Sequence, residues 1–355
     1  MIIVQLVGSI SYGDAVGNDI LAMRSVIEEM GYETAIYAEN IDKRLPEGTA
    51  YHKDKMPELA EDDVAIYHMA CGCDMSAEFA VLKCKKVMVY HNITPPHFFR
   101  DYNKNSYKVC QEGYEQLKLL ADKTDYCLAV SEYNKSDLIR MGFQCKIDVL
   151  PIIIPYEDYD KEPAQKTFDT YQDGKVNILF VGRVVPNKKH EDVIKAFYEY
   201  QKNYNANSRL IFVGSSAPHD RYRQRLDDYA KELGLENLVF PGHIKFDEIL
   251  AFYRLADVFL CQSEHEGFCV PLIEAMYLGT PIIAYDASAI AGTLGGSGIL
   301  MDTKEALVTA GMINELVTNE ELRKTVIDNQ KERLKDFDRQ VVKNQFKQYL
   351  QENVL

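Results

Sequence analysis

The chain has 355 residues, enough for two domains of ordinary size. It is 46% hydrophobic and 26% charged, as is typical of a soluble globular protein, and its formal net charge of -14 argues against general nucleic-acid binding. No apolar run approaches the roughly 20 residues of a membrane-spanning helix. The start, MIIVQLVGSIS, lacks the basic region and cleavage site of a signal peptide. We therefore expect a cytoplasmic protein with reduced cysteines and no nucleic-acid partner.

The first half of the chain alternates apolar β-branched runs with helical patterns. Residues 2–7 predict a strand, and a glycine-containing loop then leads into the helical pattern DILAMRSVIEEM. Further strands are expected at ETAIYA, DVAIYHM, KKVMVYH, YCLAVS and CKIDVLP. Strands separated by helices indicate a parallel sheet covered on both faces. Residues 1–154 are therefore expected to form one doubly wound α/β domain.

The pattern restarts after a polar, proline-bearing stretch, which we interpret as a linker at residues 155–175. Strands are expected at VNILFVG, SRLIFVG, NLVFPG, DVFLCQS and TPIIAYD, so residues 176–335 predict a second α/β domain. The last stretch, about 336–355, has the pattern of an amphipathic helix. It could pack on the second domain or cross back to the first. Ligands of such folds bind beyond the carboxyl ends of the strands, so two facing domains predict one cleft.

In the loop from Gly8 to Asn18, the backbone could approach a ligand closely at Gly13 and Gly17. The loop is neither a G-x-G-x-x-G motif nor a phosphate-binding loop that ends in Lys-Ser/Thr. By itself it identifies no ligand.

His91 follows the strand KKVMVY directly. A histidine there could donate to a sugar hydroxyl or assist charge development, and it could equally be a hydrogen-bonded structural residue. The stiff apolar loop that follows, with Phe98 and Phe99, predicts either a brace between domains or a wall for an acceptor. Asp158-Tyr159-Asp160 has the form of a metal-binding D-x-D, but it falls in the expected linker and indicates a solvated acidic stretch.

Two cations follow the strand NILFV. Arg183 and Lys188 lie five residues apart, just before a helical pattern. An arginine fork and a lysine point charge can together neutralise a diphosphate. The alternative is a solvated basic turn.

The segment SEHEGFCVPLIEAM has an acid on each side of an expected helix start. Pro271 suits the first helical position, and the loop formed by Gly267, Phe268 and Cys269 would point backbone N–H groups at an anion. Glu266 and Glu274 would repel a phosphate but accept hydrogen bonds from hydroxyl groups. A nucleotide sugar offers both features. Alternatively, both acids only cap the helix or pair with lysines.

Together these motifs resemble the retaining glycosyltransferases of the GT-B fold, specifically family 4. The resemblance rests on GRVVPNKK, on PGHI at 241–244, and on SEHEGFCVPLIEAMYLGTPIIAYD. It implies two Rossmann-like domains facing across a cleft, with the acceptor on the first, the nucleotide sugar on the second and a C-terminal helix that crosses back. The glycine loop departs from the glycine pair common in the family.

The resemblance also implies roles for individual residues. Backbone groups of Phe268 and Cys269 would contact the sugar or phosphate, and no metal would be needed. The remaining roles are the donor diphosphate for Arg183 and Lys188, the ribose for Glu274, the transferred sugar for Glu266, the base for Ile244 and the anomeric centre for His91.

The sequence thus predicts transfer of a hexose-type sugar from a nucleotide-diphosphate sugar to a glycan or glycolipid acceptor. A non-catalytic subunit of a partner transferase and a nucleotide-sugar epimerase of the same fold are the alternatives. We also expect that the loop PPHFFRDYNKNSYK contacts the cytoplasmic membrane surface through Phe98, Phe99, Arg100, Lys104 and Lys108. An ordinary loop with solvated lysines is the alternative.

Overall fold

The computed structural model describes all 355 residues, which divide into two compact units. Unit 1 consists of Met1–His97, Asn105–Pro155 and Asp336–Leu355. Unit 2 consists of Phe98–Lys104 and Tyr156–Lys335. The short segment after His97 is therefore grouped with the second unit, although it lies in the first half of the sequence.

The core of unit 1 is a parallel sheet of seven strands in the order β3-β2-β1-β4-β5-β6-β7. In chain order the strands are β1 (Ile2–Ile10), β2 (Glu33–Ile41), β3 (Tyr51–His52), β4 (Val64–Met69), β5 (Lys85–Tyr90), β6 (Tyr126–Ala129) and β7 (Lys146–Val149). This is the order of a Rossmann-like sheet, in which the direction of winding reverses between β1 and β4.

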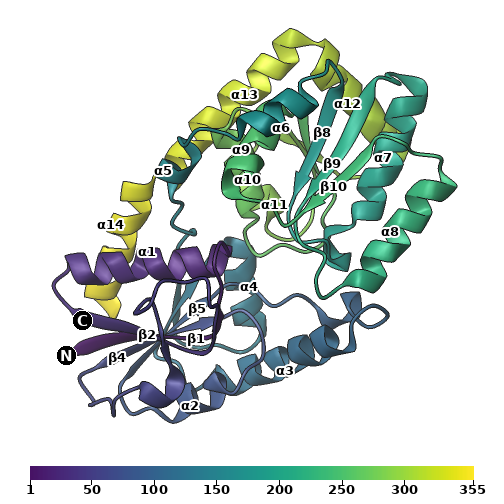
Figure 1. Ribbon diagram of the computed structural model, residues 1–355. Coiled ribbons are helices and arrows are strands. Elements are labelled where there is room, and N and C mark those ends of the chain that lie inside the picture. Colours follow the sequence, from purple (N-terminus) through teal and green to yellow (C-terminus); the bar gives the residue numbers. More distant parts are fainter. The chain divides into compact units, whose positions relative to one another are not determined.

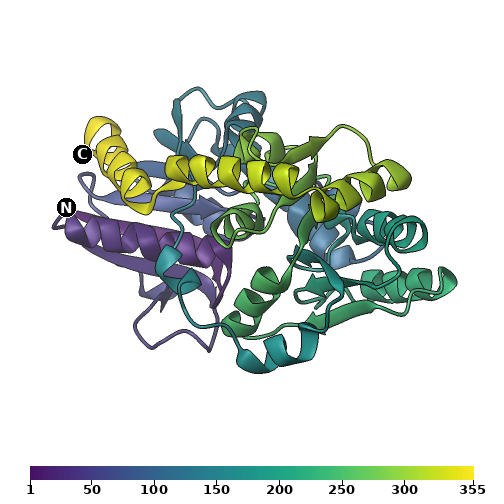
Figure 2. The ribbon, with the colours of Figure 1, turned by 90° about the horizontal axis from the view of Figure 1, so that it is seen from above.

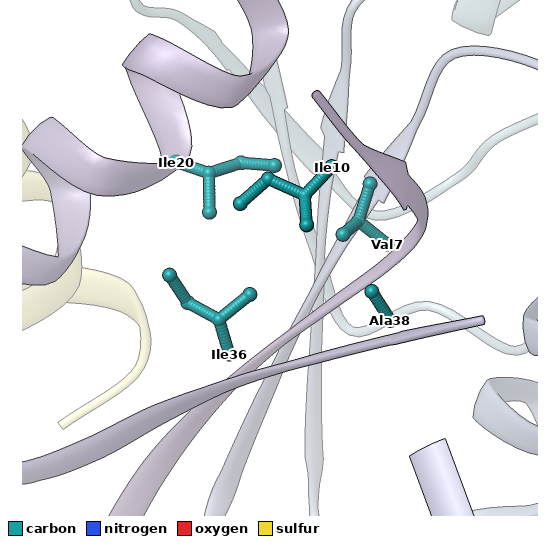
Figure 3. Packing of buried hydrophobic residues seen from close by; sticks show 5 residues of the cluster. All are labelled: Val7, Ile10, Ile20, Ile36 and Ala38. Carbon is teal, nitrogen blue, oxygen red and sulfur yellow. The ribbon is translucent and has the colours of Figure 1, made fainter. Parts of the chain in front are cut away.

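Helices pack on both faces of this sheet (Figure 1). They are α1 (Ala15–Glu29), α2 (Met75–Val81), α3 (Lys104–Leu120), α4 (Glu132–Arg140) and α14 (Arg339–Asn353), with single turns η1 (Lys53–Lys55) and η2 (Pro96–Phe98). Figure 3 shows how α1 meets the sheet: Ile20 packs against a cluster of buried side chains from β1 and β2. The apolar runs of the sequence form this core, because strands covered on both faces have no polar side. The other members of the cluster are Val7, Ile10, Ile36 and Ala38.

The C-terminal helix α14 is part of unit 1 and lies beside α1 in both views of the chain (Figures 1 and 2). Its apolar stripe is buried, with Phe346 and Leu350 fully covered. Lys343 and Lys347 pair with the carboxylate of Glu29 on α1, at 2.5 and 2.9 Å. Of the two placements that the sequence left open for this helix, the structure has the one against the first unit.

Unit 2 is built on a parallel sheet of six strands in the order β10-β9-β8-β11-β12-β13. The strands are β8 (Val176–Val181), β9 (Ser208–Val213), β10 (Leu238–Gly242), β11 (Val258–Cys261), β12 (Ile282–Tyr285) and β13 (Ile299–Met301). The order is again Rossmann-like, with the reversal between β8 and β11. The loops after β8 and β11 lead to opposite sides of the sheet at this reversal, which leaves room for a ligand between them.

Unit 2 has helices on both sides of its sheet (Figure 1). They are α5 (Tyr156–Tyr159), α6 (Gln165–Tyr171), α7 (His190–Asn203), α8 (Asp220–Glu232), α9 (Phe246–Leu255), α10 (Val270–Tyr277), α11 (Ile290–Leu294), α12 (Ala306–Thr318) and α13 (Glu320–Leu334), with the single turn η3 (Pro186–Lys188). A further turn, η4 (Lys335–Phe337), begins at the last residue of unit 2 and ends in unit 1. None of the helices in the chain combines the length and apolar character needed to cross a membrane.

The stretch expected to be a linker, residues 155–175, contains α5 and α6 and belongs to unit 2. Aromatic side chains fix it there. The ring of Tyr159 stacks on Phe246 at 5.8 Å between centroids, and Tyr171 lies 5.1 Å from Phe252. These aromatic pairs bury surface between this stretch and α9, so the residues expected to link the domains pack as part of unit 2.

Candidate functional site

The predicted donor residues follow β8 and β11, the two strands between which the sheet of unit 2 reverses its winding. Lys188 lies in η3 after β8, and Glu266 lies in the loop after β11. Because β8 and β11 pair in parallel, their carboxyl ends meet at one edge of the sheet. The two loops are thereby brought together, although their residues are 78 positions apart.

Asn187 joins these loops with two hydrogen bonds. Its side-chain Nδ2 donates to the carbonyl of His265 at 2.9 Å, and its own carbonyl accepts from the N–H of Glu264 at 2.9 Å. Asn187 is 4% exposed, so both bonds are shielded from water. Lys188 follows Asn187 in the chain and Glu266 follows His265, so these bonds fix the position of Lys188 relative to Glu266.

Lys188 and Glu266 form an ion pair. The Nζ of Lys188 lies 2.5 Å from both carboxylate oxygens of Glu266, and the side chains are 16% and 7% exposed. Burial lowers the pKa of Lys188, but the charge of Glu266, its hydrogen bond to the ammonium group and the nearby thiols together outweigh burial and raise the pKa above its ordinary value. The lysine is therefore held as a cation at the head of the β8 loop.

The loop that leads into α10 has a strained backbone. Cys269 has a φ of 73°, in the left-handed region, and precedes the first helical residue, Val270. A residue with a Cβ in this region costs on the order of 1–3 kcal/mol, a strain that clusters at functional sites. The backbone N–H groups of Gly267 and Cys269 donate to no other group of the chain. The loop therefore offers free donors beside the Lys188–Glu266 pair.

Neighbouring side chains fix this loop. The Ser288 hydroxyl accepts the N–H of Glu266 at 2.7 Å, and Thr293 Oγ1 donates to the carbonyl of Phe268 at 2.6 Å. Phe268 itself is 5% exposed.

Glu274, the second acid of the motif, lies on α10 and receives hydrogen bonds from two tyrosines. Tyr253 donates to Oε2 at 2.7 Å, and Tyr159 donates to Oε1 at 3.3 Å. Burial raises the pKa of Glu274, and these two hydrogen bonds offset part of the rise. Neither oxygen contacts a lysine, so the expected alternative of a surface ion pair does not describe this acid.

Arg183 and Ile244 stand at other strand ends of unit 2. Arg183 is the second residue after β8, is exposed, and its guanidinium makes no hydrogen bond or ion pair. Ile244 lies between β10 and α9 and is half-buried. The structure brings Lys188, Glu266 and Cys269 together, and it places Arg183 and Ile244 on the same edge of the sheet without a contact to them.

Three buried side chains around the pair have atoms that could bind a metal. One ligand atom from each of Cys261, Glu266 and Cys269 lies within 4.8 Å of the others. The same Glu266 oxygens are held by the ammonium group of Lys188. A cation would have to displace that ammonium, so this donor set does not fit a resident metal.

In unit 1, His91 is the first residue after β5 and is 8% exposed. Its Nε2 lies 3.0 Å from Nδ1 of His68, whose Nε2 lies 3.0 Å from Oε1 of Gln5. Burial lowers the pKa of His91 to about 3 and holds that of His68 well below its ordinary value. Both imidazoles are therefore neutral at physiological pH.

Gly13 and Gly17, which were predicted to lie close to a ligand, are required by the conformation of their own loop. Gly13 has a φ of 72° in the turn before α1. A Cβ on Gly17 would lie 2.8 Å from the carbonyl oxygen of Ser11. Asp14 caps the helix by accepting the N–H of Gly17 at 3.4 Å. The group that lies close to Gly17 is thus the backbone of Ser11 in the same loop.

The aromatic pair proposed for membrane contact is packed inside unit 2. Phe99 is 5% exposed and stacks on His219 at 5.3 Å between centroids, and Phe98 lies 6.4 Å from His265. Phe99 therefore has no free face for a lipid. Arg100 and Lys104 are exposed.

Several residues of the site were not anticipated from the sequence. Asn187 belongs to the GRVVPNKK motif. The available signal in the sequence was its amide side chain, which lies between the cations Arg183 and Lys188. Tyr159 was set aside with the linker, and Tyr253 looked like part of an ordinary amphipathic helix. His68 and Gln5 stand out only as polar residues inside the apolar runs VAIYHM and IIVQLV.

The fold of the whole chain matches solved glycosyltransferase structures of the GT-B class. Anabaena HepE, solved in complex with UDP-glucose, superposes with a TM-score of 0.73 at 17% identity, over 99% of this chain and 100% of that one. The two Rossmann-like sheets and this match define the fold as GT-B.

Residues 162–333 match the family model Glycosyl transferases group 1, a range that includes Lys188, Glu266 and Glu274. An uncharacterized glycosyltransferase of Methanocaldococcus jannaschii is 27% identical over 263 residues, covering 72% of this chain and 68% of the relative. A Campylobacter jejuni N-acetyl-D-galactosaminyltransferase, named for a diNAcBac-PP-undecaprenol-linked saccharide, is 26% identical over 183 residues, 51% of this chain and 49% of its own length. Residues 162–333 are therefore similar to the group 1 glycosyltransferases, and both of these relatives are glycosyltransferases.

Proposed function

We propose that the protein is a retaining glycosyltransferase that moves a hexose-type sugar from a nucleotide-diphosphate sugar to a hydroxyl of a glycan or lipid-linked glycan. The observation that carries the proposal is the buried ion pair between Lys188 and Glu266, next to unpaired N–H groups at the start of α10. This arrangement offers a cation and an acid to one ligand.

A diphosphate would replace Glu266 as the partner of Lys188. The ammonium group, the exposed guanidinium of Arg183 and the free N–H groups of Gly267 and Cys269 supply positive potential where the leaving diphosphate gains negative charge. Preorganised donors of this kind stabilise a transition state because they need no rearrangement during the reaction. The diphosphate group is accordingly placed at the edge of β8 and β11.

Once Lys188 binds the diphosphate, the Glu266 carboxylate is released to accept hydrogen bonds from hydroxyls of the transferred sugar. Positive charge develops at the anomeric carbon as its bond to the phosphate breaks, and a nearby carboxylate stabilises that charge. Retention would follow if the leaving phosphate takes the acceptor's proton on the same face of the sugar.

Glu274 is assigned to the ribose. A carboxylate has about four lone-pair positions, and the tyrosines use only two of them. The two hydroxyls of a ribose could therefore bind without displacing Tyr253 or Tyr159. Ile244, at the end of β10, would offer backbone groups to the base.

No metal is required in this scheme, because Lys188, Arg183 and the helix start already surround the diphosphate. Transfer should persist after treatment with a chelator. Activity abolished by the chelator and restored by magnesium or manganese would refute metal independence.

The relatives suggest which substrates to test first. The UDP-glucose complex of HepE supports UDP-sugars as donors, and the undecaprenol-linked saccharide in the name of the Campylobacter enzyme supports a lipid-linked glycan as acceptor. Phe99 is buried and cannot insert into a lipid surface. We therefore propose a lipid-linked acceptor without proposing that this loop contacts the membrane.

The test is release of nucleotide diphosphate from a panel of UDP-, GDP-, dTDP- and ADP-sugars, after a thermal-shift screen for binding. A bound donor raises the melting temperature by mass action. Slow hydrolysis of one donor, lost in Lys188→Ala, is expected. A non-catalytic subunit would bind without releasing diphosphate, and an epimerase would isomerise the donor sugar without cleavage. Either result would overturn the proposal.

A further inference from the structure

Three polar side chains lie in a line on one face of the unit 1 sheet. Gln5 is on β1, His68 on β4 and His91 at the end of β5, and these strands are neighbours in the order β1-β4-β5. Cα partners across the pairs are Gln5 with Ile66, and His68 with Val89. Because side chains alternate along a strand, Ile66 and His68 share a face, as do Val89 and His91. The three polar groups therefore meet diagonally across adjacent strands.

The hydrogen bonds along this line have a direction. Oε1 of Gln5 can only accept, so the Nε2 of His68, 3.0 Å away, must carry the proton. A neutral imidazole has one N–H, which leaves Nδ1 of His68 as an acceptor. The Nε2 of His91, 3.0 Å from that Nδ1, must then be the donor. Nδ1 of His91 is consequently left with a lone pair and no proton.

That last atom has no partner. Nδ1 of His91 is buried and makes no hydrogen bond, and the whole residue is 8% exposed. A buried polar atom without a partner destabilises the folded state. A hydroxyl group from a ligand could complete this acceptor by donating to Nδ1.

We propose that Gln5 and His68 are positioning residues that hold His91 in its Nε2–H tautomer, so that Nδ1 accepts a hydrogen bond from a hydroxyl of the bound sugar substrate. The identity of that hydroxyl as a sugar's rests on the proposed function. The tautomer itself depends only on the three side chains of unit 1. A neutral imidazole nitrogen can orient a substrate hydroxyl without placing a charge beside it.

The tautomer can be read by NMR on the full-length protein with ¹⁵N-labelled histidine and no substrate, with the signal assigned through His91→Asn. Nδ1 of His91 should show the pyridine-type ¹⁵N shift and Nε2 the pyrrole-type shift, both constant from pH 5 to 9. His190 is an internal control, since it is fully buried and neither of its ring nitrogens has a partner. A protonated Nδ1 on His91 would overturn the proposal.

Two variants at one position separate positioning from mere packing. Gln5→Leu removes the acceptor and should give a mixture of His91 tautomers, whereas Gln5→Glu keeps an acceptor and should restore the Nε2–H form. In a transfer assay, kcat should fall about tenfold in Gln5→Leu and recover in Gln5→Glu. An unchanged His91 tautomer in folded Gln5→Leu would refute the positioning role. If the tautomers behave as expected but no donor is cleaved, the failure lies with the proposed function instead.

Discussion

The Nζ of Lys188 lies 2.5 Å from both carboxylate oxygens of Glu266, across two loops that meet at the edge of the unit 2 sheet. The acid is thus the counter-ion of the same lysine that we assign to the diphosphate. A bound diphosphate and Glu266 would compete for one ammonium group. This competition leads to predictions that a simple list of site residues would not give.

Glu266→Gln should bind free nucleotide diphosphate at least as tightly as the wild type, because Lys188 is no longer neutralised. The gain should be up to roughly tenfold, or about 1.4 kcal/mol. Turnover should nevertheless fall about a hundredfold, since the contact to the charged sugar of the transition state is lost. Calorimetric titration of the diphosphate checks the predicted affinity, and kcat from the transfer assay checks the predicted loss of turnover. Weaker binding of the diphosphate would show that Glu266 supports that ligand directly.

Lys188→Ala and Arg183→Ala should each slow transfer by about a hundredfold, or on the order of 3 kcal/mol. Their effects on stability should differ. Loss of Lys188 leaves the buried Glu266 unpaired, which costs about 3–5 kcal/mol when one partner of a buried pair is removed. Arg183 is exposed and unpaired, so its loss should leave the melting temperature unchanged.

The double variant Lys188→Ala/Glu266→Gln is the control for these two mutants. It should regain the melting temperature but not the activity. Near-normal turnover in both single variants would show that the diphosphate binds elsewhere.

Glu274→Ala should raise KM for the donor more than it lowers kcat, because ribose contacts are the same in the ground and transition states. It should also bind the free diphosphate poorly, in contrast to the Glu266 variant. Tyr253→Phe is the matched control: it removes the 2.7 Å hydrogen bond to Glu274 but leaves the carboxylate. We expect it to lower the melting temperature with a smaller change in KM. If Glu274→Ala retains the diphosphate while Glu266→Ala loses it, the two roles are reversed.

Much of the fold followed from the alternation of apolar runs with helical patterns. The seven- and six-stranded sheets have the parallel order that this alternation predicts. Cations and acids at strand ends led to the proposed donor site for the same reason, because parallel strands bring their carboxyl ends to one edge. The ion pair itself was not predictable from spacing, since Lys188 and Glu266 are 78 residues apart and meet only because β8 pairs with β11.

The errors came from side chains whose burial depends on distant partners. Phe99 looked available to lipid, but it stacks on His219, 120 residues further along the chain. The tyrosines of the expected linker pack on α9 in the same way. Gln5 and His68 sit in strands that are otherwise apolar, and a polar residue there could not be given a role before the neighbouring strands were known.

Asp19 provides a prediction for stability against pH. It lies on α1, is fully buried, and accepts the N–H of Ile153 through Oδ1 at 2.9 Å, while Oδ2 has no partner. Burial raises its pKa from 3.8 to about 7, and the bond from Ile153 offsets part of that rise. Because the folded state binds this proton more tightly than the unfolded state, the contribution of Asp19 is greatest below about pH 4 and is lost as the pH rises toward 7. The loss is on the order of 4 kcal/mol.

Asp19→Asn cannot ionise and can keep the bond to Ile153, so its melting temperature minus that of the wild type should increase from pH 5 to pH 8. Glu29→Gln is the matched control. The ion pairs of Glu29 with Lys343 and Lys347 lower the pKa of its carboxyl to about 2, so its stabilisation is lost only as the pH falls below its unfolded value of 4.5. The difference between Glu29→Gln and the wild type should therefore stay constant over the same range. A difference for Asp19→Asn that is equally constant would show that Asp19 is ionised in the folded protein throughout, and that Oδ2 has a compensating partner in solution.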